Sequence, residues 1–260
     1  LIAMNTGLGR FPELIRKRKR EKAARKLIEA FGLKYHNWLF AYNPYYKSLS
    51  EENRLRFLQR TIAFANAKEF RFHYMNAEEY IPILISGAAV QLTFGLHNYM
   101  LNHFPTIHIV RKEYVRQADD ETYYGHVSRS DIYISWNHFL AGYHDYEDSV
   151  NVGLHEMAHA LQFDAYLGFE DSRDRNFKER LNDFSAEGRP IFRAMREGMS
   201  HVLDDYAMTN FDEFWAVSVE TFFENPEAFK ERLPVLYQEM CELLNQNPLL
   251  LHKVIDPDLL

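Results

Sequence analysis

Two histidines and a glutamate stand at a spacing that suits a metal ion. Residues 153–161 read GLHEMAHAL and contain the pattern H-E-x-x-H. On an α-helix, His155 and His159 lie one turn apart on one face, so their imidazole nitrogens can bind one zinc ion. Glu156 can reach a water on that metal as a general base without being a ligand itself. The pattern therefore predicts a zinc site that activates water.

The residues around this pattern are apolar and predict a buried helix. They are Val150, Val152, Leu154, Met157, Ala158 and Leu161. A buried glutamate and two buried histidines need partners, because unpaired polar groups cost several kcal/mol in an apolar interior. A bound metal ion supplies that compensation, whereas two hydrogen-bonded core histidines are the simpler alternative.

A catalytic zinc ion takes three protein ligands, and two downstream carboxylates compete for the third place. Glu179 stands twenty residues after His159 and is followed by Asp183, which is the spacing of thermolysin-like enzymes. The residues around Glu179 are strongly polar, however, and leave little apolar surface with which to bury such a helix. Chance matches of this kind are frequent in a chain of which 26% of the residues are charged.

Glu213, the other candidate, belongs to a strongly apolar segment. Thr209 or Asn210 can cap a helix that begins there, and a later Asn-Pro pair would end it. A carboxylate in such surroundings needs a partner. Glu220 lies seven residues further on, nearly on the same helical face, from which it could orient a zinc-bound histidine. A capping role for Glu213 and a surface position for Glu220 are the simpler alternatives.

Composition limits the class of protein. The chain has 260 residues, of which 47% are hydrophobic, so it can bury a sizeable core. Its net charge of −7 argues against nucleic-acid binding by the molecule as a whole. Cys241 is the only cysteine, which excludes a disulfide framework, and no signal peptide is visible. We therefore expect a cytoplasmic protein, while the start at Leu1 leaves open a membrane anchor in a preceding segment.

The N-terminus forms a basic helical segment, which we assign to residues 1–35. The run RKRKR at residues 16–20 lies in a helical pattern with one apolar stripe over residues 10–30. Such a cluster can contact an anionic membrane or a nucleic acid, but charge runs are more often a solvated helix face. We favour the solvated face, expect no nucleic acid, and keep membrane contact as the alternative. Residues 36–260 would then form a single domain around the zinc site.

Period-two alternation of apolar residues predicts strands just before the H-E-x-x-H helix. The alternating segments are residues 106–110, 122–127 and 132–136, with a polar turn at residues 128–131. We interpret them as a small antiparallel sheet in a chain that is otherwise mostly helical, which makes the fold class α+β. Such a sheet can present an edge to which an extended peptide adds as another strand. A plain structural hairpin is the equal alternative.

The downstream motif resembles that of a known family. The pattern Y-x-x-T-N-x-x-E-F-x-A over residues 206–216, following an H-E-x-x-H helix, resembles the Mlc titration factor A-like zinc peptidases. It also resembles the active-site plan of the anthrax lethal factor catalytic domain. Similar segments fall at residues 86–95, 132–136 and 220–223, so the likeness extends over most of the chain beyond the basic N-terminal helix.

The resemblance implies a zincin-like metallopeptidase domain that hydrolyses peptide bonds with Zn²⁺ as its cofactor. His155, His159 and Glu213 would be the metal ligands, Glu156 the general base, and Tyr206 the tyrosine that faces the reacting carbonyl. A peptide or protein would be the substrate. The family name also points to a regulatory protein partner. A binding module for a transcription regulator, with weak or vestigial peptidase activity, is therefore the alternative function.

One position departs from the family pattern. Many relatives carry an aspartate three residues after the second histidine, where this chain has Gln162. Either Asp164 takes over the bracing of a metal-bound histidine, or that bracing is absent. The resemblance leaves this choice open.

Overall fold

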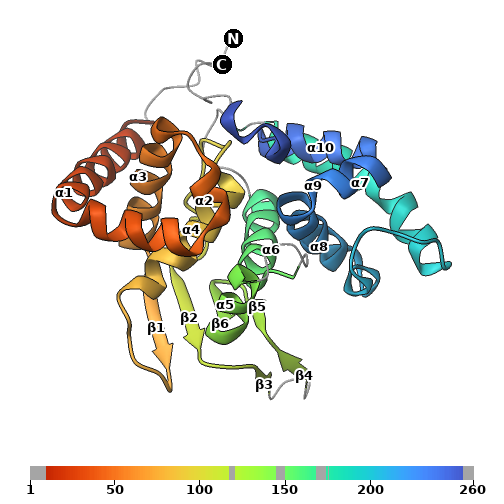
Figure 1. Ribbon diagram of the computed structural model, residues 1–260, viewed down its shortest axis with the longest axis horizontal. Helices are drawn as coiled ribbons and strands as arrows, with labels where there is room; N and C mark the ends of the chain where they lie inside the picture. The colour runs from red at the N-terminus through yellow and green to blue at the C-terminus, as the bar shows by residue number, and fades with distance from the viewer. Residues whose placement is uncertain (1–9, 117–120, 145–149, 168–173, 175, 254–260) are drawn as a thin grey trace, which may run out of the picture.

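The computed structural model describes residues 10–116, 121–144, 150–167, 174 and 176–253. The H-E-x-x-H helix is α6 (Val152–Leu167), and it runs through the middle of the molecule (Figure 1). An N-terminal group of helices lies on one side of α6, and a C-terminal group lies on the other. The fold is mostly helical with a small sheet, as the sequence predicts for an α+β chain.

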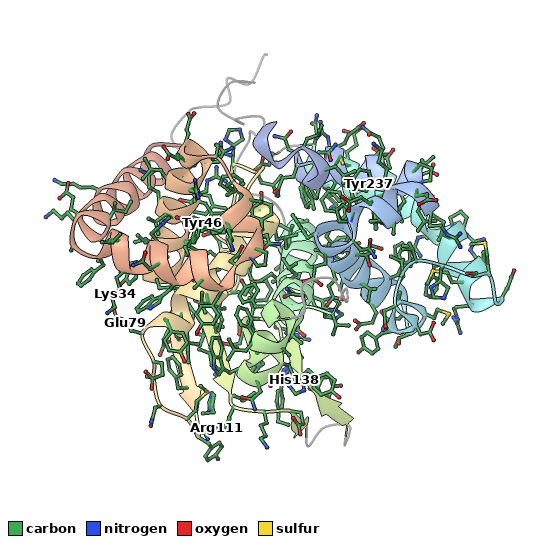
Figure 2. The ribbon with its side chains drawn as sticks, in the orientation of Figure 1. Lys34, Tyr46, Glu79, Arg111, His138 and Tyr237 are labelled. Atoms are coloured by element: carbon green, nitrogen blue, oxygen red, sulfur yellow. The ribbon has the colours of Figure 1, made fainter. Side chains whose placement is uncertain are left out.

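Four helices form the N-terminal group, and two of them begin at polar caps. They are α1 (Arg10–Tyr42), α2 (Pro44–Ser48), α3 (Glu51–Ala67) and α4 (Tyr80–Thr93). The side chains of Asn43 and Ser50 accept hydrogen bonds from backbone N–H groups in the first turns of α2 and α3. Figure 2 labels Lys34 and Glu79, whose ion pair at 2.5 Å joins α1 to the residue before α4. α4 is buried along almost its whole length, which explains its continuous apolar sequence.

The basic N-terminal segment is not set apart from the following residues by a break in the helix. α1 continues through residue 35, and Leu39 near its end is fully buried in the core. The side chains of the basic run at residues 16–20 lie outside the described residues, so the domain boundary at residue 35 stays a prediction. Within the described ranges, no helix combines the length and the apolar character that crossing a membrane requires.

The sheet is mixed, not antiparallel as we predicted. Its strands are β1 (Glu69–His73), β2 (Thr106–Val110), β5 (Gly125–Val127) and β6 (Asp131–Ser135). Their order is β1-β2-β6-β5, and β1 was not among the strands that we expected. β1, β2 and β6 run parallel, and only β5 pairs antiparallel with β6.

The connections between the strands explain this difference. α4 lies between β1 and β2 in the chain, and a separate antiparallel pair, β3 (Tyr114–Arg116) and β4 (Glu121–Tyr123), follows β2. Long connections of this kind return the chain so that neighbouring strands run in the same direction. Apolar alternation predicts which face a residue occupies but not the direction of its strand. The arrangement leaves β5 at one edge of the sheet, in contact with α6.

The C-terminal group carries the second half of the site. Its elements, together with the helix before α6, are α5 (Trp136–His144), α7 (Phe177–Arg196), η2 (Asp205–Met208), α8 (Phe211–Glu224), α9 (Pro226–Arg232), α10 (Pro234–Leu244) and η3 (Pro248–Lys253). α8 confirms the predicted helix, because Asn210 caps it and it ends before Asn225-Pro226. α7 is a single helix although it contains Pro190. One buried stripe, which includes Phe184 and Met195, continues past Pro190 and holds α7 together as a single helix.

Candidate metal centre

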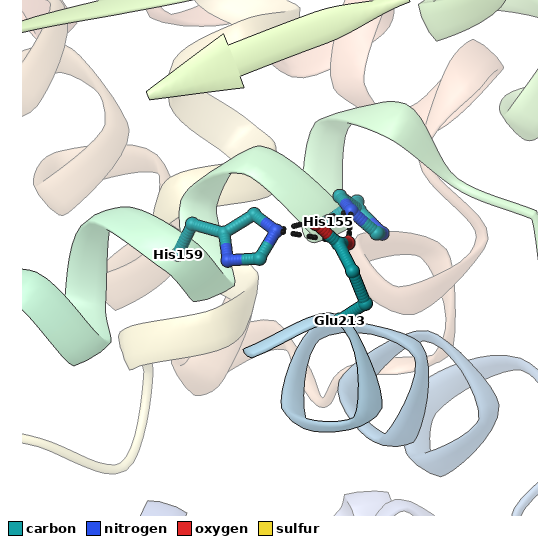
Figure 3. Close-up of side chains that lie close together, drawn as sticks. All are labelled: His155, His159 and Glu213. Atoms are coloured by element: carbon teal, nitrogen blue, oxygen red, sulfur yellow. Dashed lines mark hydrogen bonds and ion pairs between the residues drawn. The ribbon is translucent and has the colours of Figure 1, made fainter. Parts of the chain in front are cut away.

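Two helices bring three potential metal ligands together. His155 and His159 lie one turn apart on α6, and Glu213 lies in the first turn of α8, as Figure 3 shows. The Nε2 atoms of the two histidines are 3.2 Å apart. Glu213 Oε2 is 2.9 Å from His155 Nε2 and 3.3 Å from His159 Nε2. In the described part of the chain, this is the one cluster of three or more histidine, cysteine or acidic residues that could hold a metal ion.

Local contacts determine where α8 meets α6. The side-chain oxygen of Asn210 accepts the N–H groups of Asp212 and Glu213 at 2.9 and 3.0 Å, so it sets the residue at which α8 begins. The indole N–H of the fully buried Trp215 donates to the carbonyl of Ala158, next to the second histidine, at 2.9 Å. These bonds explain why an apolar helix presents a carboxylate at this point.

The three ligand atoms are spaced as a tetrahedral metal ion requires. Metal–ligand bonds of about 2.0–2.1 Å in tetrahedral geometry place ligand atoms about 3.3 Å apart. The observed separations of 2.9, 3.2 and 3.3 Å are close to that value. Two imidazole nitrogens and one carboxylate oxygen are also a donor set of catalytic metal sites. The residues therefore fit a divalent metal ion.

The charges at the site point to the same conclusion. Burial raises the pKa of Glu213, but hydrogen bonds from His155 and His159 outweigh it and lower the pKa to about 2. Burial lowers the pKa of His155. The charge of Glu220 and hydrogen bonds to the carboxylates of Glu213 and Glu220 outweigh this effect and hold the pKa of His155 well above its usual range. The carboxylates thus draw positive charge to the point where the ligand atoms meet.

Glu156 lies on the cleft side of α6 beneath β5. It is 5% exposed, and no donor within the described residues reaches its Oε2. Burial raises the pKa of Glu156 to about 7, although the charges of the two histidines oppose this. Gly125 of β5 makes room for the carboxylate, because a Cβ at that position would lie 2.5 Å from Glu156 Oε1. A buried carboxylate with such a pKa is suited to accept a proton and release it again.

Tyr206 lies in η2, at the rim of the same cleft. The centroid of its ring is 5.9 Å from that of His155, and the residue is 54% exposed. The side chain of Asp204 accepts the backbone N–H of Tyr206 at 2.8 Å and so caps this short helix. The tyrosine predicted to face the reacting carbonyl therefore lies beside the predicted ligands.

Glu220 lies two turns beyond Glu213 on α8 and is 5% exposed. Its Oε1 is 3.4 Å from His155 Nδ1 and accepts the backbone N–H of Asn151 at 3.0 Å. Burial raises the pKa of Glu220, and the neighbouring His155 counteracts this effect. A carboxylate on the far nitrogen of a ligand histidine can fix the orientation of its ring.

The competing third ligand lies elsewhere. Glu179 and Asp183 are exposed on α7, and neither lines the cleft that contains the two histidines. The thermolysin-like assignment therefore has no geometric support among the described residues.

Of the two alternatives that the resemblance left open, the contacts of Asp164 do not support the one in which this residue braces a metal-bound histidine. Asp164 is five residues beyond His159, which turns it about 140° around the helix. It contacts the side chain of His103 and accepts the backbone N–H of that residue at 3.3 Å. Gln162 instead donates to Asp212 Oδ1 at 3.0 Å and joins α6 to the first turn of α8.

The cleft around the ligands has a volume of about 400 Å³. β5 forms one wall, α6 forms the floor, and η2 with the start of α8 forms the other wall.

Our sequence analysis missed Gly125, His126 and Asn151. A glycine within an alternating strand is a signal for a close approach of the backbone, so Gly125 could have been recognised. His126 lines the cleft and stacks on Tyr133 with ring centroids 4.3 Å apart.

An H-E-x-x-H pair, a carboxylate from a second helix and a buried glutamate beside them are the parts of a metal-dependent peptidase site. Comparison with known proteins agrees with this class. The chain belongs to the family of the glucose-regulated metallo-peptidase M90, whose model matches residues 15–244.

Three individual relatives show how far the sequence similarity extends. An uncharacterized protein of Synechocystis sp. is 25% identical over 224 residues, which cover 80% of this chain and 82% of the relative. Mlc titration factor A of Escherichia fergusonii is 48% identical over 48 residues, or 18% of each chain. Mlc titration factor A of Escherichia coli is 42% identical over 57 residues, or 22% of each chain. The resemblance to the titration factor family is thus confirmed, and that to anthrax lethal factor stays a prediction.

Proposed function

We propose that this protein is a zinc-dependent peptidase with His155, His159 and Glu213 as its metal ligands. One observation carries the proposal: three ligand atoms from two helices lie 2.9–3.3 Å apart next to a buried glutamate. Membership of a metallo-peptidase family supports it. Zinc favours two imidazoles and a carboxylate in catalytic sites, which makes it the metal we propose.

The residues of the chain divide the work of hydrolysis. When bound, zinc supplies Lewis acidity, which polarises the scissile carbonyl and lowers the pKa of a water molecule. Glu156 takes the proton of the attacking water and passes it to the leaving amine. The hydroxyl of Tyr206 donates a hydrogen bond to the developing oxyanion, and one such donor is typically worth about 3 kcal/mol. Glu220 keeps the ring of His155 turned toward the metal position.

We further propose that the peptide substrate lies extended along β5. β5 is the outer strand of the order β1-β2-β6-β5, and Gly125, His126 and Val127 all line the cleft. An extended peptide that adds to such an edge gains backbone hydrogen bonds without a sequence requirement. Its scissile bond could then lie above Glu156.

The first test is metal content, measured by elemental analysis of the wild type, Glu213→Ala and Glu179→Ala. We expect nearly one zinc per chain in the wild type and in Glu179→Ala, and a loss of most zinc in Glu213→Ala. Hydrolysis of a mixture of synthetic peptides, followed as release of free amines, should decrease in parallel. A wild type that cannot be loaded with zinc would exclude the peptidase, and loss of zinc in Glu179→Ala alone would exclude the ligand set.

The names of the relatives favour a second function, that of a regulatory binding module. Two of the relatives described above are named Mlc titration factor A. Titration calorimetry of purified Mlc with the wild type and with Glu156→Gln would test this role. Equal binding by both proteins, together with no hydrolysis by the wild type, would favour the binding module over the peptidase.

We also propose that the protein acts in the cytoplasm and that the basic residues of α1 face solvent. Its single cysteine is compatible with a reducing compartment. Sedimentation with vesicles that contain phosphatidylserine should leave the protein in the supernatant. Recovery in the pellet would favour the membrane-contact alternative for residues 10–30.

A further inference from the structure

Asn151, the residue before α6, is a buried polar group that the proposed chemistry does not use. It is 1% exposed. Its Oδ1 accepts the backbone N–H of Leu154 at 3.0 Å, and its carbonyl accepts the N–H of His155 at 2.9 Å. These two bonds make Asn151 the N-cap of the motif helix, one turn before the first histidine.

The two donors of Asn151 both reach α8. Its backbone N–H donates to Glu220 Oε1 at 3.0 Å, and its side-chain Nδ2 donates to Glu224 Oε1 at 2.8 Å. Glu220 and Glu224 lie one turn apart and are 5% and 6% exposed. A single asparagine therefore joins the start of α6 to two consecutive turns of α8.

This junction bears directly on the orientation of His155. The oxygen that accepts the N–H of Asn151 is the same Glu220 Oε1 that lies 3.4 Å from His155 Nδ1. The position of that oxygen governs the rotation of the imidazole ring and hence the position of its Nε2. Glu213 belongs to the same helix, so a shift of α8 against α6 would move two partners of His155 together.

We propose that Asn151 is a positioning residue of the metal centre, which orients His155 by clamping Glu220 and Glu224 to the start of α6. The proposal rests on the proposed function and deepens it. Asn151 acts through the two glutamates and touches neither metal nor substrate.

The chain offers a matched control in Asn43. This residue is also 1% exposed and also caps a helix, since its Oδ1 accepts the N–H of Tyr46 at 2.7 Å. Its Nδ2 likewise reaches other elements, namely Gln91 Oε1 at 3.2 Å and the Tyr143 hydroxyl at 3.0 Å. None of these residues lines the cleft. Serine caps a helix about as well as asparagine, so Asn→Ser at either position removes only the bridging amide donor.

The experiment compares the wild type, Asn151→Ser and Asn43→Ser. Zinc dissociation constants come from competition with a chromogenic chelator, and metal-free thermal unfolding reports the structural cost. We expect both variants to lower the metal-free melting temperature. Only Asn151→Ser should weaken zinc binding, by about tenfold or more, as changes around ligand histidines typically do. It should also alter the visible spectrum of the cobalt-loaded protein, which reports ligand geometry.

A second variant tests whether a loss of zinc affinity comes from the hydrogen bond between Asn151 and Glu224 or from a general loss of stability. Glu224→Ala removes the acceptor of the same hydrogen bond, so the double variant with Asn151→Ser should bind zinc about as weakly as Asn151→Ser alone. Additive losses, unchanged zinc affinity in Asn151→Ser, or an equal loss in Asn43→Ser would each overturn the proposal. If the wild type itself binds no zinc, the proposed function is wrong, and this outcome differs from those that would overturn only the role of Asn151.

Discussion

Two networks of buried polar side chains among the described residues differ in charge: one is neutral and the other is charged. The neutral network joins α2, α4, α5 and the residue that follows the C-cap of α10. Asn43 donates to Gln91 Oε1 and to the Tyr143 hydroxyl, and Tyr45 donates to Gln246 Oε1 at 2.6 Å. Gln246 in turn donates to the carbonyls of residues 91 and 92 at 3.1 and 2.9 Å. Amides and hydroxyls here act as donors and acceptors for one another, so the network carries no charge.

The charged network joins α6 and α8 and consists mainly of carboxylates. Its acidic members are Glu156, Glu213, Glu220 and Glu224, and its imidazoles are His155 and His159. Carboxylates cannot donate hydrogen bonds to one another when ionised, and buried charges need compensation. The neutral network therefore pairs its own donors with its own acceptors, whereas the proposed zinc ion would supply the charge that the carboxylates of the other network need.

The largest effect should come from removing the proposed base. Glu156→Gln should lower peptide hydrolysis by about 10²–10⁴-fold, or roughly 3–5 kcal/mol in the activation barrier, with zinc content unchanged. The metal-free variant should be no less stable than the metal-free wild type, because a neutral amide replaces a buried carboxylate. Hydrolysis at the wild-type rate would show that Glu156 is not the base.

Removal of the metal should lower the melting temperature of the protein through the charged network and not through the neutral one. Zinc at a hundred times its dissociation constant stabilises a folded protein by about 2.7 kcal/mol, which corresponds to roughly 5–10 °C in melting temperature here. Calorimetry with and without a chelator measures the difference. A melting temperature that does not respond to chelation in the zinc-loaded wild type would contradict the comparison, since both networks would then be complete without a cation.

The neutral network should respond to mutation but not to metal. Gln246→Ala leaves the Tyr45 hydroxyl without its acceptor and should lower the free energy of unfolding by about 2 kcal/mol. The loss should be the same with zinc and with chelator, because the two networks share no residue. Urea unfolding under both conditions tests this, and a loss confined to the zinc-loaded form would show that the networks are coupled.

The smallest effect on stability and on zinc affinity should come from Gln162, at the edge of the charged network. Gln162 donates to the exposed Asp212 at 3.0 Å, and Gln162→Ala should cost about 1 kcal/mol or less in unfolding free energy. Zinc affinity should change by less than about threefold, because Gln162 is bonded to no ligand. A tenfold loss of zinc affinity would mean that this position does the bracing that the family pattern assigns to an aspartate.

Local sequence patterns predicted the helices of the site well. The apolar surroundings of the H-E-x-x-H pattern predicted a buried helix, and a cap at Thr209 or Asn210 predicted the start of α8, where Asn210 is the cap. Choosing between Glu179 and Glu213 depended on apolar burial, which is a local property, and on the family resemblance. The structure brings Glu213 to the two histidines and leaves Glu179 exposed.

Contacts between distant segments were harder to predict. The parallel pairing of β1, β2 and β6 depends on connections around α4, and apolar alternation carries no information about direction. The resemblance left the role of Asp164 open, and helix geometry decides against bracing, because a side chain five residues along a helix faces elsewhere. In the sequence, Asn151 looks like an ordinary helix cap. Its hydrogen bonds to Glu220 and Glu224 join residues about seventy positions apart in the chain, and no short-range pattern encodes such contacts.

The proposed ligands are divided between α6 and α8, which has a consequence for the order of events during synthesis. A nascent chain that has emerged only through α6 presents the two histidines but lacks Glu213, which follows 54 residues after His159. Such a chain would hold zinc weakly, with two ligands in place of three. Tight metal capture, and with it the ability to cut peptides, would wait until α8 has folded onto α6. In terms of the proposed function, peptidase activity would arise only after α8 has been synthesised, and not while the chain has emerged only through α6.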